Sequence, residues 1–242
     1  RKMGEHLRKQ GSPFEIQMYD IEGCFPNMPK HGIELAIQDE VSTLHRSGRK
    51  CVWIPRARSK ECLWDRPKKK MQGTWMPLID LADILKFALH NAFIKMPNGE
   101  IRKQTCGIPM GCPTSPGMTI LTTRWMEQEW LKTVPKETDS FFKPARYMDD
   151  IIIGLSSSDQ WDKDKFLADF KANCYWDPLK LEAPPHQDAF LETSFHISNG
   201  LVETKLKNDN EFGTNIWRYH HFESQMSYTI KRATVMATLR KV

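Results

Sequence analysis

Cys-x-x-Cys pairs and long apolar runs are both missing from this sequence. The six cysteines, at positions 24, 51, 62, 106, 112 and 174, have no spacing typical of a zinc ribbon or a disulfide framework, so we expect reduced, packed thiols. No apolar run approaches the roughly 18 to 20 residues of a membrane helix, and residues 1–10 lack the apolar centre of a signal peptide. These absences predict a soluble, intracellular chain that contacts no membrane.

The composition is that of a globular protein. The chain has 242 residues, of which 40% are hydrophobic and 27% charged, without an internal repeat or a low-complexity tract. Such a chain forms one globular domain or two small ones and is not disordered throughout. Because it begins with Arg1 rather than methionine, we expect a segment of a longer or processed protein, which acts with the rest of that polypeptide or with protein partners.

Positive charge is concentrated in one segment. The net charge is +5, yet residues 45–70 carry ten Lys or Arg against two acidic residues, which gives +8 there and −3 elsewhere. One interpretation is a phosphate-binding strip, with Trp53 and Trp64 available for stacking. The alternatives are a solvated loop or a docking site for an acidic protein. The basic residues expected to contact nucleic acid are Arg56, Arg58, Lys68, Lys69 and Lys70.

Two segments predict strands that carry aspartates. In FEIQMYDI, residues 14–21, apolar and more polar residues alternate, which is the period of a half-buried strand, and Asp20 falls on the apolar parity. Residues 141–155 predict two strands joined in a hairpin, with Asp149 and Asp150 at its tip. Each aspartate is either a solvated polar end or a ligand held by a rigid element.

Helical periods alternate with these strands. Residues 81–93 carry an apolar stripe that follows Asp80 as a helix cap. A glycine- and proline-rich loop leads to a helix with Ser115 as N-cap and Pro116 at the first helical position. Another helix is expected near 160–174.

Turn signals complete the expected fold. Asn98-Gly99 predicts a turn into a strand around 101–106, and Asn199-Gly200 predicts a hairpin between two further strands. Because hairpins are frequent, we expect an α+β fold in which an antiparallel or mixed sheet has helices packed on one face.

Taken together, the three aspartates suggest a metal site. Asp20, Asp149 and Asp150 all stand at predicted strand ends. Carboxylates from separate strands that converge on one spot suit Mg²⁺, which takes oxygen ligands, and two such ions can activate a 3′-hydroxyl and stabilise a leaving pyrophosphate. The repulsion between the carboxylates would then be offset by the ions.

Four motifs, in this order, resemble the palm of a reverse transcriptase: YDIEGCF, GIPMGCPTSP, YMDD between apolar strands, and a hairpin that begins FLE. The resemblance covers residues 14–207. It implies a palm over 1–207, which contains the basic segment 45–70, and the start of a thumb over 208–242. Within the family, the sequence is most similar to Penelope-like retroelements, which are relatives of telomerase, while DIEGCF hints at group II intron enzymes.

The resemblance implies a two-metal site and a deoxynucleotide substrate. Asp20 and Asp149 would bind both Mg²⁺ ions, which Mn²⁺ can replace, with Asp150 beside them and the backbone carbonyl of Ile21 reaching an ion. Phe25 matches the aromatic steric gate that a 2′-hydroxyl would strike, so deoxynucleotides are expected. The alternative for Phe25 is an ordinary core phenylalanine.

Further residues match positions that contact nucleotide or nucleic acid. Met110 and Gly111 lie in the loop expected beneath the templating base, and Met110 stands where many family members have glutamine. Lys180 occupies the place of a lysine that can protonate the leaving pyrophosphate, with a plain surface lysine as the alternative. The resemblance also assigns contacts with the nucleotide or primer end to Tyr147 and Met148, with the template to Ser115 and Pro116, and with the primer to Phe190 and Leu191.

The implied function is RNA-directed DNA polymerisation, which extends a DNA or RNA primer along an RNA template with deoxynucleoside triphosphates, and the family implies the nucleus. Only nineteen residues precede Asp20, so we expect most of the fingers to lie outside the chain and these residues alone to bind metal weakly and not to polymerise. The alternatives are a domesticated, non-catalytic nucleic-acid or assembly scaffold and, less favoured because of Phe25, an RNA-directed RNA polymerase.

Overall fold

The computed structural model describes residues 14–56, 61–64, 72–136, 138, 141–156, 162–184, 189–191, 193–198 and 201–206. Its helices are α2 (Cys24–Asn27), α3 (Lys30–Arg46), α4 (Leu78–His90), α5 (Ser115–Leu131) and α6 (Lys163–Asn173). Its strands are β1 (Phe14–Ile21), β2 (Cys51–Pro55), β3 (Gly73–Pro77), β4 (Phe93–Lys95), β5 (Ile101–Lys103), β6 (Phe142–Tyr147), β7 (Asp150–Ser156), β8 (Leu181–Glu182), β9 (Ala189–Phe190), β10 (Thr193–Ser198) and β11 (Leu201–Leu206). No described helix is long and apolar enough to cross a membrane.

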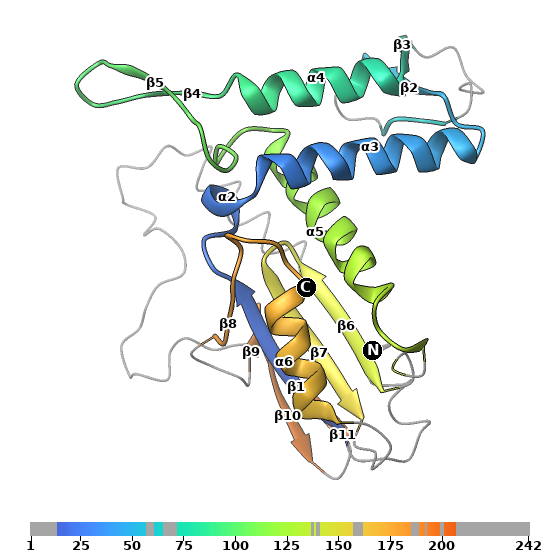
Figure 1. Ribbon diagram of the computed structural model, residues 1–242, viewed down its shortest axis with the longest axis vertical. Coiled ribbons are helices and arrows are strands. Elements are labelled where there is room, and N and C mark those ends of the chain that lie inside the picture. Colours follow the sequence, from blue (N-terminus) through green and yellow to red (C-terminus); the bar gives the residue numbers. More distant parts are fainter. Residues whose placement is uncertain are drawn as a thin grey trace, which may run out of the picture.

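A four-stranded antiparallel sheet in the order β6-β7-β1-β8 forms the centre of the fold (Figure 1). Strands β6 and β7 form the hairpin expected from the sequence, and β1 pairs with β7 from Phe14 to Asp20. The other described strands form the three-stranded sheet β11-β10-β9 and the hairpins β2-β3 and β4-β5. The predicted α+β fold with an antiparallel sheet is therefore confirmed.

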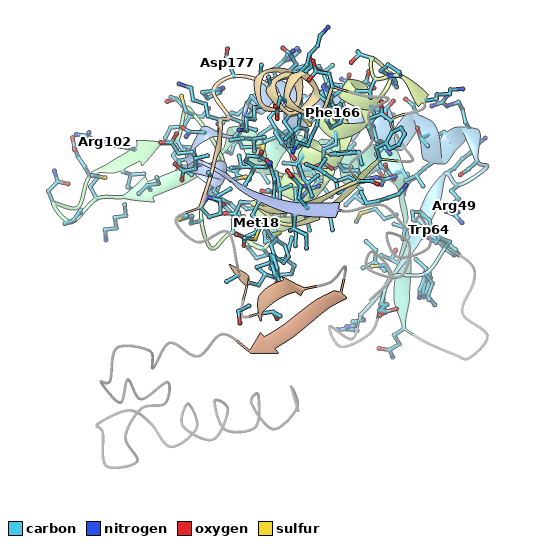
Figure 2. The ribbon with its side chains drawn as sticks, turned by 90° about the horizontal axis from the view of Figure 1, so that it is seen from below. Met18, Arg49, Trp64, Arg102, Phe166 and Asp177 are labelled. Atoms are coloured by element: carbon cyan, nitrogen blue, oxygen red, sulfur yellow. The ribbon has the colours of Figure 1, made fainter. Side chains whose placement is uncertain are left out.

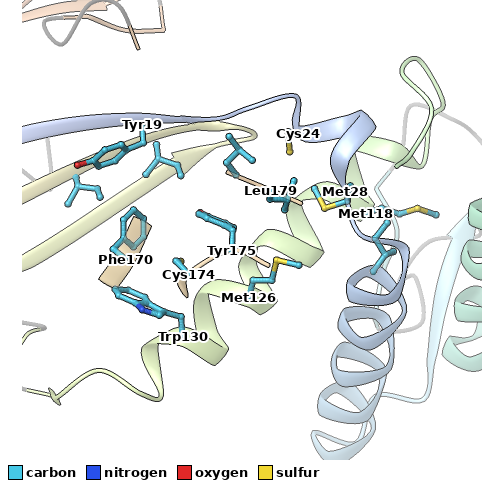
Figure 3. Close-up of a cluster of buried hydrophobic side chains, with 14 of the residues drawn as sticks. Tyr19, Cys24, Met28, Met118, Met126, Trp130, Phe170, Cys174, Tyr175 and Leu179 are labelled. Carbon is cyan, nitrogen blue, oxygen red and sulfur yellow. The ribbon is translucent and has the colours of Figure 1, made fainter. Parts of the chain in front are cut away.

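Helices α5 and α6 cover one face of the central sheet with an aromatic core (Figure 3). The ring of Trp130 on α5 lies 5.2 Å from that of Phe170 on α6 and 6.0 Å from that of Phe142 on β6. The Trp130 indole N–H donates to the carboxylate of Asp169 at 2.9 Å, so the one polar atom of this side chain is satisfied. The sheet thus has helices packed on one face, as the sequence predicts.

Strand β1 is covered on both faces, which corrects the expectation of a half-buried strand. Tyr19 faces the helices, with its ring 6.1 Å from that of Phe170, and is 4% exposed. Met18, on the opposite parity, is 2% exposed. In Figure 2, α6 lies on one side of β1 and the β9–β11 sheet lies on the other. Since side chains alternate along a strand, Asp20 lies on the face away from α6.

Helix α5 packs closely against α3. Gly32 on α3 lies so near α5 that a Cβ there would come within 2.9 Å of the Met126 side chain. Thr119, Thr122 and Thr123 are buried on α5, and each hydroxyl donates to the carbonyl four residues earlier, at 3.0, 2.8 and 2.8 Å. Polar residues can therefore face a tight helix contact without an unsatisfied group.

Helix starts differ from the predictions by a few residues. Helix α4 begins at Leu78 after Pro77, and Asp80 lies in its first turn rather than at the cap, because Leu78 is buried and draws the helix start toward the core. Thr114, not Ser115, is the N-cap of α5, since the Ser115 hydroxyl donates instead to the carbonyl of Pro109 at 2.7 Å.

Two other predicted segments, a strand and a helix, are shorter than expected. Several other predicted residues and segments lie outside the described residues. The strand expected around 101–106 is β5, which ends at Lys103, because the Gln104 carbonyl accepts a bond from the Lys30 ammonium at 2.8 Å. The helix expected near 160–174 is α6, capped by Asp162. Arg58, Lys68, Lys69, Lys70, the Asn199-Gly200 turn and segment 208–242 lie outside the described residues.

Replacing Trp130 by alanine tests the aromatic core. Because Trp130 is 5% exposed and contacts three aromatic rings, Trp130→Ala should lower the free energy of unfolding by about 3–5 kcal/mol, as measured by urea denaturation. The matched control is Trp64→Ala, since Trp64 is 41% exposed. Equal losses in the two variants would contradict the proposed role of Trp130.

Candidate active site

The three aspartates meet where β1 ends beside the β6-β7 hairpin. Asp20, on β1, is the register partner of Asp150, the first residue of β7, while Asp149 lies in the two-residue turn that precedes it. The Ile21 N–H donates to the Asp149 carbonyl at 3.2 Å. That bond makes Asp20 and Asp150 a non-hydrogen-bonded pair, with Cα atoms about 4.5 Å apart, the antiparallel geometry in which facing side chains lie closest.

Burial and neighbouring carboxylates disfavour the charged forms of Asp20 and Asp150. Burial first, and then the charge of Asp149, raise the pKa of Asp20, while a hydrogen bond from the Ile21 backbone lowers it. Burial, followed by the charges of Asp149 and Asp20, raises the pKa of Asp150. The same two carboxylates reach the buried thiol of Cys24, whose pKa rises to about 12 mainly through burial, so this neighbour stays neutral. The site is therefore one of concentrated negative charge.

A further carboxylate, which the sequence analysis did not identify, stands on the other side of Asp20. Glu182 on β8 is its register partner across that edge, and it is exposed. Strand β8 has two residues, too few for a periodic signal, so its pairing with β1 has no local signature.

The donor set suits a hard cation, although it is not a preformed cage. Among the described residues, no group of three or more His, Cys, Asp or Glu side chains converges closely enough to hold a metal ion. Mg²⁺ usually takes only one or two carboxylates and completes its shell with water and phosphate oxygens. Carboxylates whose pKa is raised by burial and by neighbouring carboxylates, as those of Asp20 and Asp150 are, fit such an ion, because its charge would offset the repulsion.

A part-buried polar network that was not predicted contacts the turn. Arg146, next to the YMDD motif, donates from Nε to Oε1 of Glu127 at 2.5 Å and from Nη1 to the Met148 carbonyl at 3.0 Å. The Tyr175 hydroxyl donates to the same Glu127 oxygen at 2.5 Å. These residues come from β6, α5 and the segment after α6, so no local spacing in the sequence could reveal their contact.

The loop that begins at Gly107 is pressed against the segment that carries Phe25. The Ile108 N–H donates to the Phe25 carbonyl at 2.9 Å. Gly107 has φ of 64°, and a Cβ there would lie 2.2 Å from the Pro26 carbonyl oxygen. Phe25 itself is half-buried against the hydrophobic core. Two of the motifs quoted above therefore make direct backbone contact.

The remaining site residues fall into two groups, one close to the three aspartates and one distant from them. Tyr147 is 62% exposed beside Asp150, and the Lys180 carbonyl accepts a bond from the Glu22 N–H at 2.9 Å, which puts both residues next to the aspartates. Met110, 78% exposed, and Gly111 lie in the loop before Ser115 and Pro116. Phe190 and Leu191 belong to the β9 region. Arg56 lies at the β2-β3 hairpin, which stands at the start of α4 and away from the central sheet (Figure 1).

Gly107→Ala tests the contact between the two motifs. The added methyl group would strike backbone that cannot rotate away, at a positive φ, so we expect the free energy of unfolding to fall by about 2 kcal/mol or more. The control Gly117→Ala, in α5 with nothing within 4 Å of its Cβ, should instead gain up to about 1 kcal/mol. Urea denaturation measures both, and a neutral Gly107→Ala would contradict the tight packing.

Comparisons with known proteins agree with this architecture. A family model described as reverse transcriptase (RNA-dependent DNA polymerase) matches residues 54–184. Apo telomerase from Candida tropicalis has a TM-score of 0.56 and 11% identity over 85% of this chain and 35% of that chain. Telomerase from Candida albicans, solved with a TWJ fragment of telomeric RNA, has a TM-score of 0.58 and 10% identity over 88% of this chain and 36% of that chain.

These likenesses differ in what they establish. The chain spans about a third of the length of the solved telomerases, and at 10 to 11% identity the likeness shows the fold alone. No curated protein matches the sequence. The family model, however, covers more than half of the 242 residues, and the chain therefore belongs to the reverse transcriptase family.

Proposed function

We propose that this chain is the catalytic palm of an RNA-directed DNA polymerase that adds deoxynucleotides to a primer 3′-hydroxyl by two-metal catalysis. The observation that supports it best is the pairing of Asp20 with Asp150 beside the turn that carries Asp149. The proposal includes the narrower placement near Penelope-like elements, and it implies action in the nucleus. We propose residues 1–207 as the palm and 208–242 as the start of the thumb.

The aspartates have separate roles in this proposal. Asp20 and Asp149 hold Mg²⁺, or Mn²⁺ in its place, together with the backbone carbonyl of Ile21, and Asp150 beside them is the third carboxylate of the metal site. When bound, the two ions lower the pKa of the primer 3′-hydroxyl and stabilise the leaving pyrophosphate. Lys180, whose backbone carbonyl lies beside the end of β1, is proposed to give a proton to that pyrophosphate.

The surrounding residues bind the nucleotide and the nucleic acid. Phe25 lies under the sugar and excludes a 2′-hydroxyl, and Tyr147 contacts the primer end. The other proposed nucleotide contacts are Met110, Gly111 and Met148, the template contacts are Ser115 and Pro116, and the primer contacts are Phe190 and Leu191. The β9–β11 sheet lies on the same side of β1 as Asp20, which supports a primer contact there (Figure 2).

The basic segment is proposed to hold a strand of nucleic acid away from the aspartates. Trp64 of this segment is 41% exposed, whereas Trp53 is half-buried and pairs with the 41% exposed Trp75 of β3. The Arg49 guanidinium lies 5.1 Å from the centre of the Trp64 ring. Exposed aromatic rings beside basic side chains bind single-stranded nucleic acid by stacking and by phosphate contacts. Arg56, Arg58 and Lys68 to Lys70 would supply further phosphate contacts.

Asp149→Asn tests the metal role. Losing one ligand charge should lower primer extension at least about 100-fold, since metal stabilisation is worth several kcal/mol. The measurement is extension of a DNA or RNA primer on an RNA template with deoxynucleotides and Mg²⁺, using the 242 residues and a longer polypeptide that contains them. Asp39→Asn, on the exposed side of α3, is the matched control.

The same assay separates the alternative functions. Activity of Asp149→Asn equal to that of the control would exclude the proposed metal role. Nucleic-acid binding without extension by the longer polypeptide would favour the non-catalytic scaffold.

Phe25→Val tests the choice of sugar. A smaller side chain should admit the 2′-hydroxyl, so the ratio of deoxynucleotide to ribonucleotide incorporation should fall at least about tenfold, measured as kcat/KM for each. A smaller amount of folded protein lowers both kcat/KM values equally, so it does not change this ratio. Phe87→Val, at an exposed position on α4, should leave the ratio unchanged. An unchanged ratio in Phe25→Val would remove the argument against an RNA-directed RNA polymerase.

A further inference from the structure

The turn that presents Asp149 has an unfavourable backbone conformation. Met148, its first residue, has φ of 59°. A positive φ is uncommon for residues other than glycine, and hairpin turns that need one usually place glycine or asparagine there. The surrounding structure must therefore hold this turn in place.

Arg146 makes the contact that holds it. Its Nη1 donates to the Met148 carbonyl at 3.0 Å, while Nε and Nη2 donate to the two oxygens of Glu127 at 2.5 and 3.3 Å. The Arg146 side chain is 11% exposed and that of Glu127 is 27% exposed. A planar guanidinium that engages a carboxylate bidentately has a fixed orientation, which leaves its remaining nitrogen aimed at the turn.

Tyr175 holds the Glu127 carboxylate in place. Its hydroxyl donates to Oε1 of Glu127 at 2.5 Å, the same oxygen that accepts from Arg146 Nε. Burial raises the pKa of Tyr175 well above its ordinary value, so the hydroxyl keeps its proton and remains a donor. A chain of hydrogen bonds, which we call the clamp, thus runs from Tyr175 through Glu127 and Arg146 to the Met148 carbonyl.

The opposite side of the turn is held by β1. The Ile21 N–H donates to the Asp149 carbonyl at 3.2 Å. Consecutive carbonyls of the turn are therefore bound from different directions, one by a side chain anchored on α5 and the other by the backbone of the strand that carries Asp20. If the hydrogen bond to one of these carbonyls were lost, the turn would be held only at the other carbonyl and could rotate about it.

We propose that Glu127 and Tyr175 are positioning residues, which aim Arg146 at the Met148 carbonyl and so orient Asp149 toward Asp20. The part concerning metal binding rests on the proposed function, whereas the part concerning the turn does not. An ion pair that only neutralises charge between α5 and β6 would stabilise the protein without controlling the turn, and this is the competing explanation.

Two variants of different severity test the proposal in the 242-residue chain. Arg146→Lys keeps the charge near Glu127 but cannot reach the carboxylate and the Met148 carbonyl in the same planar fork. Tyr175→Phe removes one hydrogen bond and keeps the ring in the core. The matched control is Glu129→Gln, because Glu129 lies on the same helix and pairs only with the exposed Lys132 just after the helix end among the contacts described.

Amide hydrogen exchange is the first measurement, and it requires no metal. Both variants should speed exchange of the Ile21 N–H at least about threefold more than that of the Ile153 N–H in the middle of β7, since loss of the clamp loosens the turn and not the sheet. A general loss of stability would speed both amides equally. Equal changes at Ile21 and Ile153, or no change at Ile21 in either variant, would overturn the proposal.

Mn²⁺ affinity is the second measurement, followed by electron paramagnetic resonance of the free ion. We expect Kd to rise about tenfold in Arg146→Lys, less in Tyr175→Phe, and not in Glu129→Gln. If the wild-type chain binds Mn²⁺ no better than Asp149→Asn does, the metal role in the proposed function fails, and the exchange data alone decide whether the clamp exists. If the wild type binds more tightly and Arg146→Lys matches it, the positioning role is overturned.

Discussion

The pairing of β1 with β7 sets Asp20 directly opposite Asp150, and the other features of the site depend on that register. Like charges that face each other destabilise a sheet. The register is nevertheless fixed, because Tyr19 and Ile21 on β1 and Ile151 and Ile153 on β7 are buried against the helices. A slip by one residue would turn these side chains to the other face. The apolar core therefore forces the carboxylates together.

Helix α5 connects the core to the turn that carries Asp149. Near its C-terminal end, Trp130 lies among the rings of α6 and β6, and one turn earlier Glu127 holds Arg146 under Met148. At its N-terminal end, the Ser115 hydroxyl closes the loop that begins at Gly107. A displacement of this one helix would thus reach the turn, the loop and the core together, and the close contact with α3 at Gly32 opposes such a displacement.

Local patterns predicted the parts of the structure that have local causes. The β6-β7 hairpin, the acids at its tip and the helix over 163–173 follow from periods and turns visible within about ten residues. The prediction of a half-buried β1 was wrong because the cover of Met18 comes from distant segments. The Ser115 cap was wrong because Pro109 competes for the hydroxyl. Glu127, Tyr175 and Glu182 have no periodic signal, so only the fold brings them to the site.

The division of β1 into two faces explains how a rigid core and a charged site share one short sheet. Tyr19 and Ile21 pack against the aromatic layer, and Asp20 between them points away from it. The family model begins at residue 54 and does not include Asp20, so the link between this aspartate and the YMDD turn comes from strand pairing. A substrate that approaches the Asp20 face meets carboxylates held by the strands and by the clamp beneath the turn. Because helices occupy the other face, the strands can hold the aspartates in place while their side chains stay partly exposed.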